Sequence, residues 1–170
     1  MKKYLIALIA FSFLAGASCQ QKIDVPNEEE AIKAVIKQEI ALWLDQDYIP
    51  ESDFVRKVDY AIVINNNGNN HELIVGWEGI LAKIKESSEG DWSELSNGKI
   101  ECRDFHIKVY GDVAWAVYYE QLTGEWKGEP FDITHTKVTI LEKVDGNWKL
   151  VLNSITRLDP CETEDDEDDE

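Results

Sequence analysis

Three polar side chains on one predicted strand form the pattern most suited to chemistry. Asp132, Thr134 and Thr136 alternate along residues 131–143, so all three share one strand face, which continues as an apolar face further along. A carboxylate in apolar surroundings has a raised pKa and can act as a general acid or base. Such a polar patch suits the mouth of a pocket, although hydrogen-bonded groups at an ordinary sheet edge give the same pattern.

Aromatic residues are the next source of functional groups. Most should belong to the core, but Tyr48 and Tyr118 could present their hydroxyl groups inward. Trp126 lies between Gly124 and Gly128 in a predicted loop, where it either gates a pocket or packs on the sheet. The aromatic residues that could form the wall of a pocket are Trp43, Tyr48, Trp77, Trp115, Tyr118 and Tyr119.

Metal and cofactor chemistry have little support in the sequence. His71, His106 and His135 are far apart and show neither an HxH nor an HExxH spacing. There is no GxSxG motif and no phosphate-binding glycine loop. We therefore predict no metal and no cofactor.

The N-terminus has the pattern of an export signal. Lys2 and Lys3 precede an apolar run of 11 residues, Tyr4 to Leu14, which is shorter than the roughly 20 residues of a membrane-spanning helix. Small residues follow and end at Cys19, so the segment resembles a bacterial lipoprotein signal with its lipobox. That resemblance implies cleavage before Cys19 and lipidation of its thiol. An ordinary secretory signal with a chance cysteine is the alternative.

The lipoprotein resemblance also bears on localisation. Several acyl chains hold a protein on a bilayer far more firmly than one chain does. The expected partner is therefore the membrane, reached through the lipid anchor. Gln20 stands where an aspartate retains some lipoproteins at the inner membrane, so the outer membrane is favoured.

Charge excludes one class of partner. The formal net charge is −17, and residues 162–170 contain eight acidic residues and one threonine. A run of like charges repels itself, so residues 159–170 are predicted to be a disordered acidic tail. Nucleic-acid binding requires clustered basic residues, and we therefore predict none.

The elements that must position these residues follow from hydrophobic periodicity. Asn27 is the predicted N-cap of a first long helix, and a second begins at Trp77. The predicted ranges are helices at 27–47, 50–55 and 77–87, and strands at 60–64, 73–75, 99–110, 113–123, 131–143 and 147–157. This order lacks the β-α-β alternation of a parallel sheet. It predicts an α+β cone, in which a curved, mostly antiparallel six-stranded sheet wraps around N-terminal helices. The predicted divisions are a signal peptide at 1–18, a lipidated tether at 19–26, one domain at 27–158 and the tail at 159–170.

Three motifs carry a resemblance to a known superfamily. They are Gly76-Trp77-Glu78-Gly79-Ile80, Gly111-Asp112-Val113-Ala114-Trp115-Ala116, and the last hairpin from Leu141 to Leu150. In this order and spacing, the chain resembles the NTF2-like (cystatin-like) superfamily, in particular its SnoaL-like and DUF4440 branch. An unrelated α+β sandwich is the alternative.

The resemblance implies a pocket between the concave face of the sheet and the helices. Many relatives carry a histidine near the positions of Leu152 and Ser154, and its absence here weakens a hydrolytic or dehydratase interpretation. The residues expected to line the pocket are Trp43, Tyr48, Trp77, Asp132, Thr134, Thr136, Trp148, Leu152 and Ser154.

Two classes of function stay open. The preferred one is a lipid-anchored, non-catalytic binding or interaction module of unknown ligand, either a small apolar molecule or a second copy of the chain. Residues 113–122 are apolar on both strand faces, which favours a homodimer through the outer sheet face. The alternative is a small-molecule isomerase or lyase, resembling SnoaL or ketosteroid isomerase, with Asp132 as base and Tyr48 or Tyr118 as donor.

Cys102 and Cys161 are the thiols that remain once Cys19 is lipidated. In a simple meander they stand about 14 Å apart, whereas a disulfide requires Cα atoms within about 7 Å. A bridge would form only if the tail crossed the end of the sheet.

Overall fold

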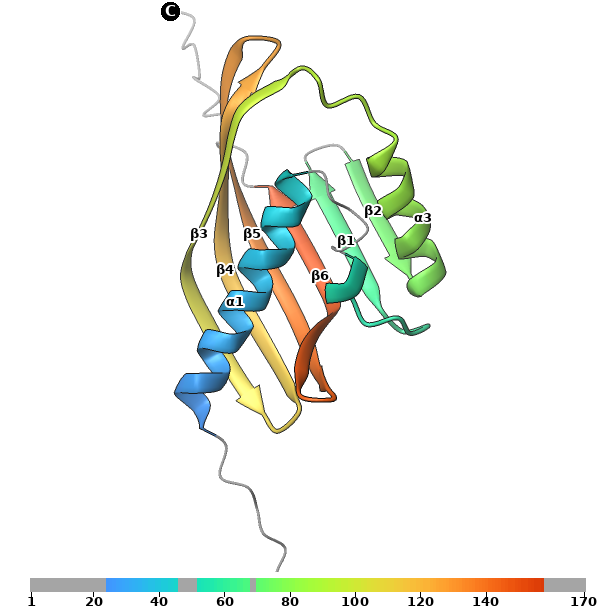
Figure 1. The fold of residues 1–170 in the computed structure, drawn as a ribbon, viewed down its shortest axis with the longest axis vertical. Coiled ribbons are helices and arrows are strands. Elements are labelled where there is room, and N and C mark those ends of the chain that lie inside the picture. Colours follow the sequence, from blue (N-terminus) through green and yellow to red (C-terminus); the bar gives the residue numbers. More distant parts are fainter. Residues whose placement is uncertain (1–23, 46–51, 68–69, 158–170) are drawn as a thin grey trace, which may run out of the picture.

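The computed structural model describes residues 24–45, 52–67 and 70–157 (Figure 1). The elements are α1 (Val25–Leu44), the 3-10 helix η1 (Ser52–Phe54), β1 (Ile62–Asn67), β2 (Asn70–Val75), α3 (Trp77–Ser88), β3 (Leu95–Tyr110), β4 (Val113–Trp126), β5 (Glu129–Val144) and β6 (Asn147–Arg157). Within these ranges, no helix is long and apolar enough to cross a membrane.

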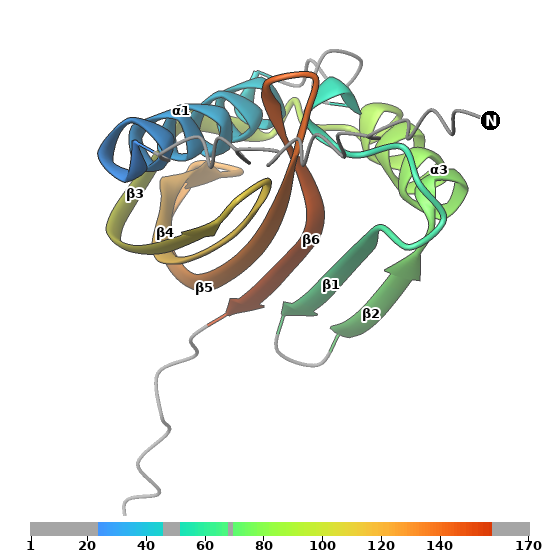
Figure 2. The same ribbon diagram turned by 90° about the horizontal axis from the view of Figure 1, so that it is seen from below.

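The strands form one six-stranded sheet in the order β2-β1-β6-β5-β4-β3. Four of the five neighbouring pairs are antiparallel, and β1 runs parallel to β6. Figure 2 shows the strands curving beneath α1 on one side and α3 on the other. The predicted α+β architecture, with a curved and mostly antiparallel sheet around helices, is confirmed.

Two irregularities in β3 accompany this curvature. The register with β4 shifts between Ser96 and Lys99, and again between Arg103 and His106. Asn97 and Asp104 adopt positive φ angles of 54° and 56° at these points. Asparagine and aspartate tolerate this conformation best among residues with a side chain, and a bulge bends its strand.

The first helix starts earlier than the sequence pattern indicated. Asp24 is its N-cap, and Pro26 lies in its first turn. Proline is tolerated there because the first-turn N–H groups have no partner within the helix. The prediction of Asn27 as N-cap was therefore wrong by three residues, and the helix also ends earlier, at Leu44 rather than Asp47.

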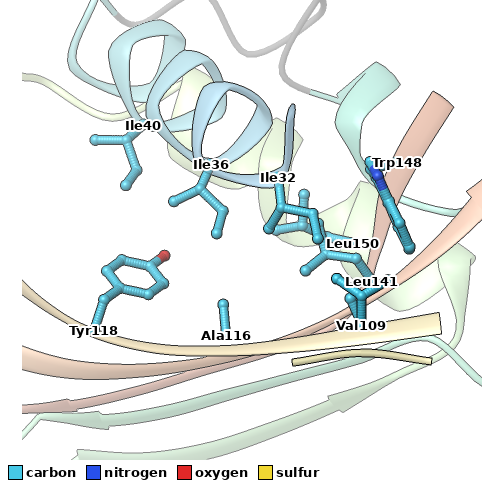
Figure 3. Close-up of a cluster of buried hydrophobic side chains, with 10 residues drawn as sticks. Ile32, Ile36, Ile40, Val109, Ala116, Tyr118, Leu141, Trp148 and Leu150 are labelled. Atoms are coloured by element: carbon cyan, nitrogen blue, oxygen red, sulfur yellow. The ribbon is translucent and has the colours of Figure 1, made fainter. Parts of the chain in front are cut away.

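The core lies between α1 and the concave face of the sheet (Figure 3). Ile32, Ile36 and Ile40 recur every four residues along α1, so they form one stripe, and each is at most 6% exposed. Full burial of one such side chain contributes about 1.5–3 kcal/mol. The stripe packs on residues of four strands, namely Val109, Ala114, Ala116, Tyr118, Leu141, Trp148 and Leu150.

Short turns join the long strands. Asp145-Gly146 has φ angles of 50° and 82°, and Lys127-Gly128 has 56° and 82°. Positive φ at both central positions is what a two-residue type I′ hairpin requires. The predicted Asp145-Gly146 turn is confirmed, whereas the loop predicted at residues 124–130 contracts to two residues because β4 continues to Trp126.

Candidate functional site

A cavity of about 310 Å³ opens beside the core, between the C-terminal half of α1, α3 and the concave sheet face. Its lining is mainly apolar, but a few polar side chains converge in it, as they do in many ligand sites. The apolar lining includes Ile40, Trp43, Ile74, Ile80, Ile84, Trp92, Ile100, Leu122, Leu150, Val151 and Ile155. The ionisable lining residues are Glu39, Lys83, Glu120, His135 and Lys137.

Glu120 is the centre of a buried polar cluster on two neighbouring strands. It lies directly opposite His135 in the β4–β5 ladder, and Lys137 is two positions further along β5. One carboxylate oxygen of Glu120 lies 3.2 Å from Nδ1 of His135, and the other lies 3.3 Å from Nζ of Lys137. Burial acts to raise the pKa of Glu120, but the Lys137 ammonium and the His135 contact outweigh it, so the net shift is downward. Glu120 is therefore held as a carboxylate.

Glu39 reaches the same cluster from the helix. It follows Ile36 by three residues and Ile32 by seven, so it belongs to the buried stripe of α1 and is 8% exposed. Burial raises the pKa of its carboxyl group, and the negative charge of Glu120 adds to the rise, while Lys137 opposes it. In the described part of the chain no hydrogen-bond donor reaches this carboxylate. The cavity thus contains two carboxylates whose pKa values are shifted in opposite directions.

Three tryptophans form an aromatic wall from the cavity to the surface. Trp43 and Trp92 line the cavity and meet edge to face, with ring centroids 5.9 Å apart. Trp92 meets Trp126 in the same way at 6.5 Å, and its Nε1 donates a hydrogen bond to the backbone oxygen of Ser87. Trp126 was predicted either to gate a pocket or to pack on the sheet. The structure places it at the end of β4, with its ring against Trp92, which precedes β3.

Comparison with known proteins identifies the family. A family model described as a SnoaL-like domain matches residues 54–155. This chain belongs to the SnoaL-like domain family. No curated protein matches it.

Solved structures share the SnoaL-like fold at low sequence identity. An NTF2-like protein of unknown function from Pseudomonas putida KT2440 superposes with a TM-score of 0.66 and 14% identity, covering 81% of this chain and 92% of that one. An NTF2-like protein with a cystatin-like fold from Novosphingobium aromaticivorans has a TM-score of 0.63 and 15% identity, covering 79% and 84%. A Streptomyces avermitilis protein of the NTF2-like family, provisionally assigned as a dehydratase, has a TM-score of 0.64 and 14% identity, covering 78% and 97%. These likenesses confirm the predicted NTF2-like fold.

The polar patch predicted on β5 of this SnoaL-like domain lies on the wrong face for the cavity. β5 is regular opposite β4, so Asp132, Thr134 and Thr136 point away from His135 and Lys137, which line the cavity. Asp132 is exposed, and both of its carboxylate oxygens accept hydrogen bonds of 2.9 Å from the Gln121 amide. The prediction that these three residues line the pocket is wrong, and Asp132 is not placed to act as its base.

A bulge moves the predicted residues of β6 out of the cavity. Ile140 pairs with Leu152, but Leu141 pairs with Leu150, so Val151 is an extra residue in β6. Trp148 and Leu150 face the helix, after which Val151, Asn153 and Ile155 line the cavity. The prediction that Leu152 and Ser154 line the pocket assumed regular alternation and is therefore wrong.

The predicted aromatic lining is found in part. Trp43 lines the cavity, as predicted. Trp148 lies in the core, Trp77 begins α3 beneath the Lys57 ammonium, and neither lines the cavity. Tyr118 stacks on Phe105 with centroids 4.7 Å apart in the core and is also absent from the lining. Tyr48 lies outside the described residues.

The two acidic residues that the site brings together were not predicted from the sequence. Glu39 interrupts the apolar stripe of the first helix, and Glu120 follows Tyr118 by two positions on the inner face of its strand. A charged residue in register with buried apolar ones was the available signal in both cases.

The remaining reactive groups lie elsewhere. Cys102 is a half-buried free thiol, and burial raises its pKa to about 11, so it is protonated at neutral pH. Cys161, the other thiol considered for a disulfide, lies outside the described residues. Among residues 24–45, 52–67 and 70–157, no group of three His, Cys, Asp or Glu side chains is arranged to hold a metal ion.

Proposed function

We propose that the cavity binds a small, largely apolar molecule and that Glu39 transfers a proton to or from it, as in an isomerase or lyase. One observation carries this proposal. A carboxyl group of raised pKa, 8% exposed and without a hydrogen-bond donor among the described residues, lines an apolar cavity. Sequence alone favoured a non-catalytic module, but it assigned the acid–base role to a residue on the other face.

The neighbours of Glu39 support a division of roles. Two titratable groups whose surroundings push their pKa values apart are typical of acid–base sites. Glu120 stays ionised because Lys137 and His135 contact its carboxylate. It therefore contributes a fixed negative charge to the cavity and does not exchange protons. The raised pKa of Glu39 brings it nearer to neutral pH, where a carboxyl group works best as both acid and base.

A simple proton exchange tests this proposal without knowledge of the natural substrate. The probe is 2-indanone, a neutral bicyclic ketone, and NMR follows the loss of its α-protons in D₂O. We expect the purified protein to accelerate the exchange and E39Q to abolish the acceleration, while D132N leaves it unchanged because Asp132 lies on the opposite face. Exchange that is equally fast with E39Q would overturn the role of Glu39, and no acceleration by the unmodified protein would count against proton transfer.

A specific feature also supports the interaction module. Leu152, Ile140 and Trp115 are consecutive register partners on β6, β5 and β4, so they form one apolar row on the outer face of the sheet. Ile62, which joins Val75 to this row in the ladder, also lines the cavity. Trp115 and Val75 are 38% and 56% exposed. Apolar residues arranged this way across a solvent-facing sheet suit an interface, and we propose that two copies pair through it.

We also propose that Cys19 anchors the protein to the outer membrane. Five residues separate Cys19 from the start of α1 at Val25, a link of at most about 20 Å. Metabolic labelling with an alkynyl fatty acid should mark the protein, and C19A should lose the label. Labelling of C19A at the original level would exclude this cysteine as the site.

A further inference from the structure

We infer that the cavity selects ligands whose polar end donates hydrogen bonds and carries no negative charge, with an ammonium group preferred over a carboxylate. This inference rests on the proposed ligand-binding role of the cavity. It follows from two cavity-lining acceptors that have no hydrogen-bond donor among the described residues.

Two acceptors in the cavity wall have no donor in the described part of the chain. The first is the carboxylate of Glu39, which is 8% exposed. The second is Oδ1 of Asn153, which is buried and unpartnered, as is the hydroxyl of Thr139 opposite it in the ladder. In the β5–β6 ladder, Asn153 pairs with Thr139. Lys137 lies two residues before Thr139 on β5 and pairs with Ile155. The Asn153 side chain is therefore a near neighbour of Lys137 on the same sheet face, and Lys137 in turn acts on Glu39. A buried acceptor without a donor is destabilising, so a ligand whose donor reaches Glu39 stabilises the bound state.

The cationic groups of the cavity are already engaged. Lys137 and His135 both contact the Glu120 carboxylate, at 3.3 and 3.2 Å. Lys83, on α3, lies between Glu72 at 3.4 Å and Glu86 at 3.0 Å. An anionic ligand would find no free cation among these groups and would place its negative charge near the Glu120 carboxylate. A cationic ligand would instead complete the pairing of two carboxylates with two ammonium groups.

The remaining walls fit the body of such a ligand. Trp43 and Trp92 present aromatic surface, and Leu122 and Ile155 contribute from the sheet. Aromatic rings also attract cations that lie over their faces. The volume of about 310 Å³ is at the lower end of the range for ligand pockets, so it suits a body of one or two rings.

Three probes with one body test the inference. They are 2-aminoindane, 2-indanol and indane-2-carboxylate, which differ only in the charge and hydrogen bonding of one substituent. Calorimetry on the purified full-length protein at pH 7 should give the order amine, alcohol, carboxylate, with the amine at least 10-fold tighter than the carboxylate. In E39Q the ratio of amine to carboxylate affinity should fall towards one. D132N serves as the matched control, because it removes an acidic group from the other sheet face, and it should keep the ratio.

The possible outcomes separate this inference from the proposed proton transfer. Tighter binding of the carboxylate, or an amine preference that survives in E39Q, would overturn the inference. So would the absence of binding by all three probes while 2-indanone exchange still depends on Glu39. Preserved order without any exchange of 2-indanone would support the inference and overturn only the proton transfer.

Discussion

Nε1 of Trp148 donates a hydrogen bond of 2.8 Å to Oε2 of Glu28, and so joins the last hairpin to the first turn of α1, 120 residues earlier. The other oxygen of Glu28 accepts a 2.6 Å bond from Nζ of Lys143. This contact fixes the start of α1 on the sheet. The position of Glu39 further along the same helix depends on it.

Replacing Glu28 with alanine should destabilise the fold by about 2 kcal/mol, because the buried indole N–H would lose its acceptor and Lys143 its partner. Urea denaturation followed by tryptophan fluorescence measures the loss. Glu30 provides the control, since it lies in the same helical turn but bonds only to Lys33 at the surface. A loss from E30A as large as that from E28A would contradict the role given to Trp148.

The Glu28 contact should also make stability depend on pH. The hydrogen bonds from Lys143 and Trp148 hold the pKa of Glu28 below its usual value near 4.5. A carboxyl group with a lowered pKa in the folded state contributes fully above its unfolded pKa, and the contribution disappears as the pH falls through the folded pKa. We expect the difference in free energy of unfolding between the unmodified protein and E28Q to be constant from pH 6 to 8. It should shrink below about pH 4.3. A difference that stays constant down to pH 3 would show that ionisation of Glu28 does not matter.

Removal of Lys137 should cost more than removal of any exposed lysine. Lys137 is 4% exposed, and its charge lowers the pKa of both Glu39 and Glu120, so K137M leaves two buried carboxyl groups without the ammonium that acts on both. Breaking a buried ion pair by removing one partner costs about 3–5 kcal/mol. Thermal and urea unfolding measure the loss, and K57M, which removes an exposed lysine paired with Asp53, serves as control. A small loss from K137M would mean that Glu39 is already protonated and needs no cation.

The arrangement of elements could be predicted because it depends on local patterns. The stripe of Ile32, Ile36 and Ile40 and the Asp145-Gly146 turn are both legible from spacing and residue type alone. Their combination with long alternating strands limits the sheet to a few arrangements. The parallel pairing of β1 with β6 was not foreseen, because it joins residues that are 90 positions apart in the sequence.

The site could not be predicted with the same success, because it depends on which face each strand presents. A shift of one residue moves every following side chain to the other face. The bulge at Val151 makes this shift in β6, and no glycine or proline marks it. β5 is regular, but its face with Asp132 was predicted to be the inner one. His135 and Lys137 contact Glu120, so the face that carries them is the inner face.

The outer sheet face gives the last prediction, which tests the proposed homodimer. Trp115 and Trp126 lie on the same strand and are similarly exposed, at 38% and 41%, but they face opposite sides of the sheet. Trp115 ends the apolar row, whereas Trp126 packs on Trp92 beside the cavity. Large aromatic residues at an interface often contribute 2 kcal/mol or more to binding, about a 30-fold change in the dissociation constant.

W115E should therefore convert the dimer into a monomer, because it places a charge where two apolar rows would meet, and W126E should leave the dimer intact. Size-exclusion chromatography with light scattering at micromolar concentration measures the mass of each. A monomeric unmodified protein, or a dimer that is lost in W126E and kept in W115E, would exclude pairing through this face.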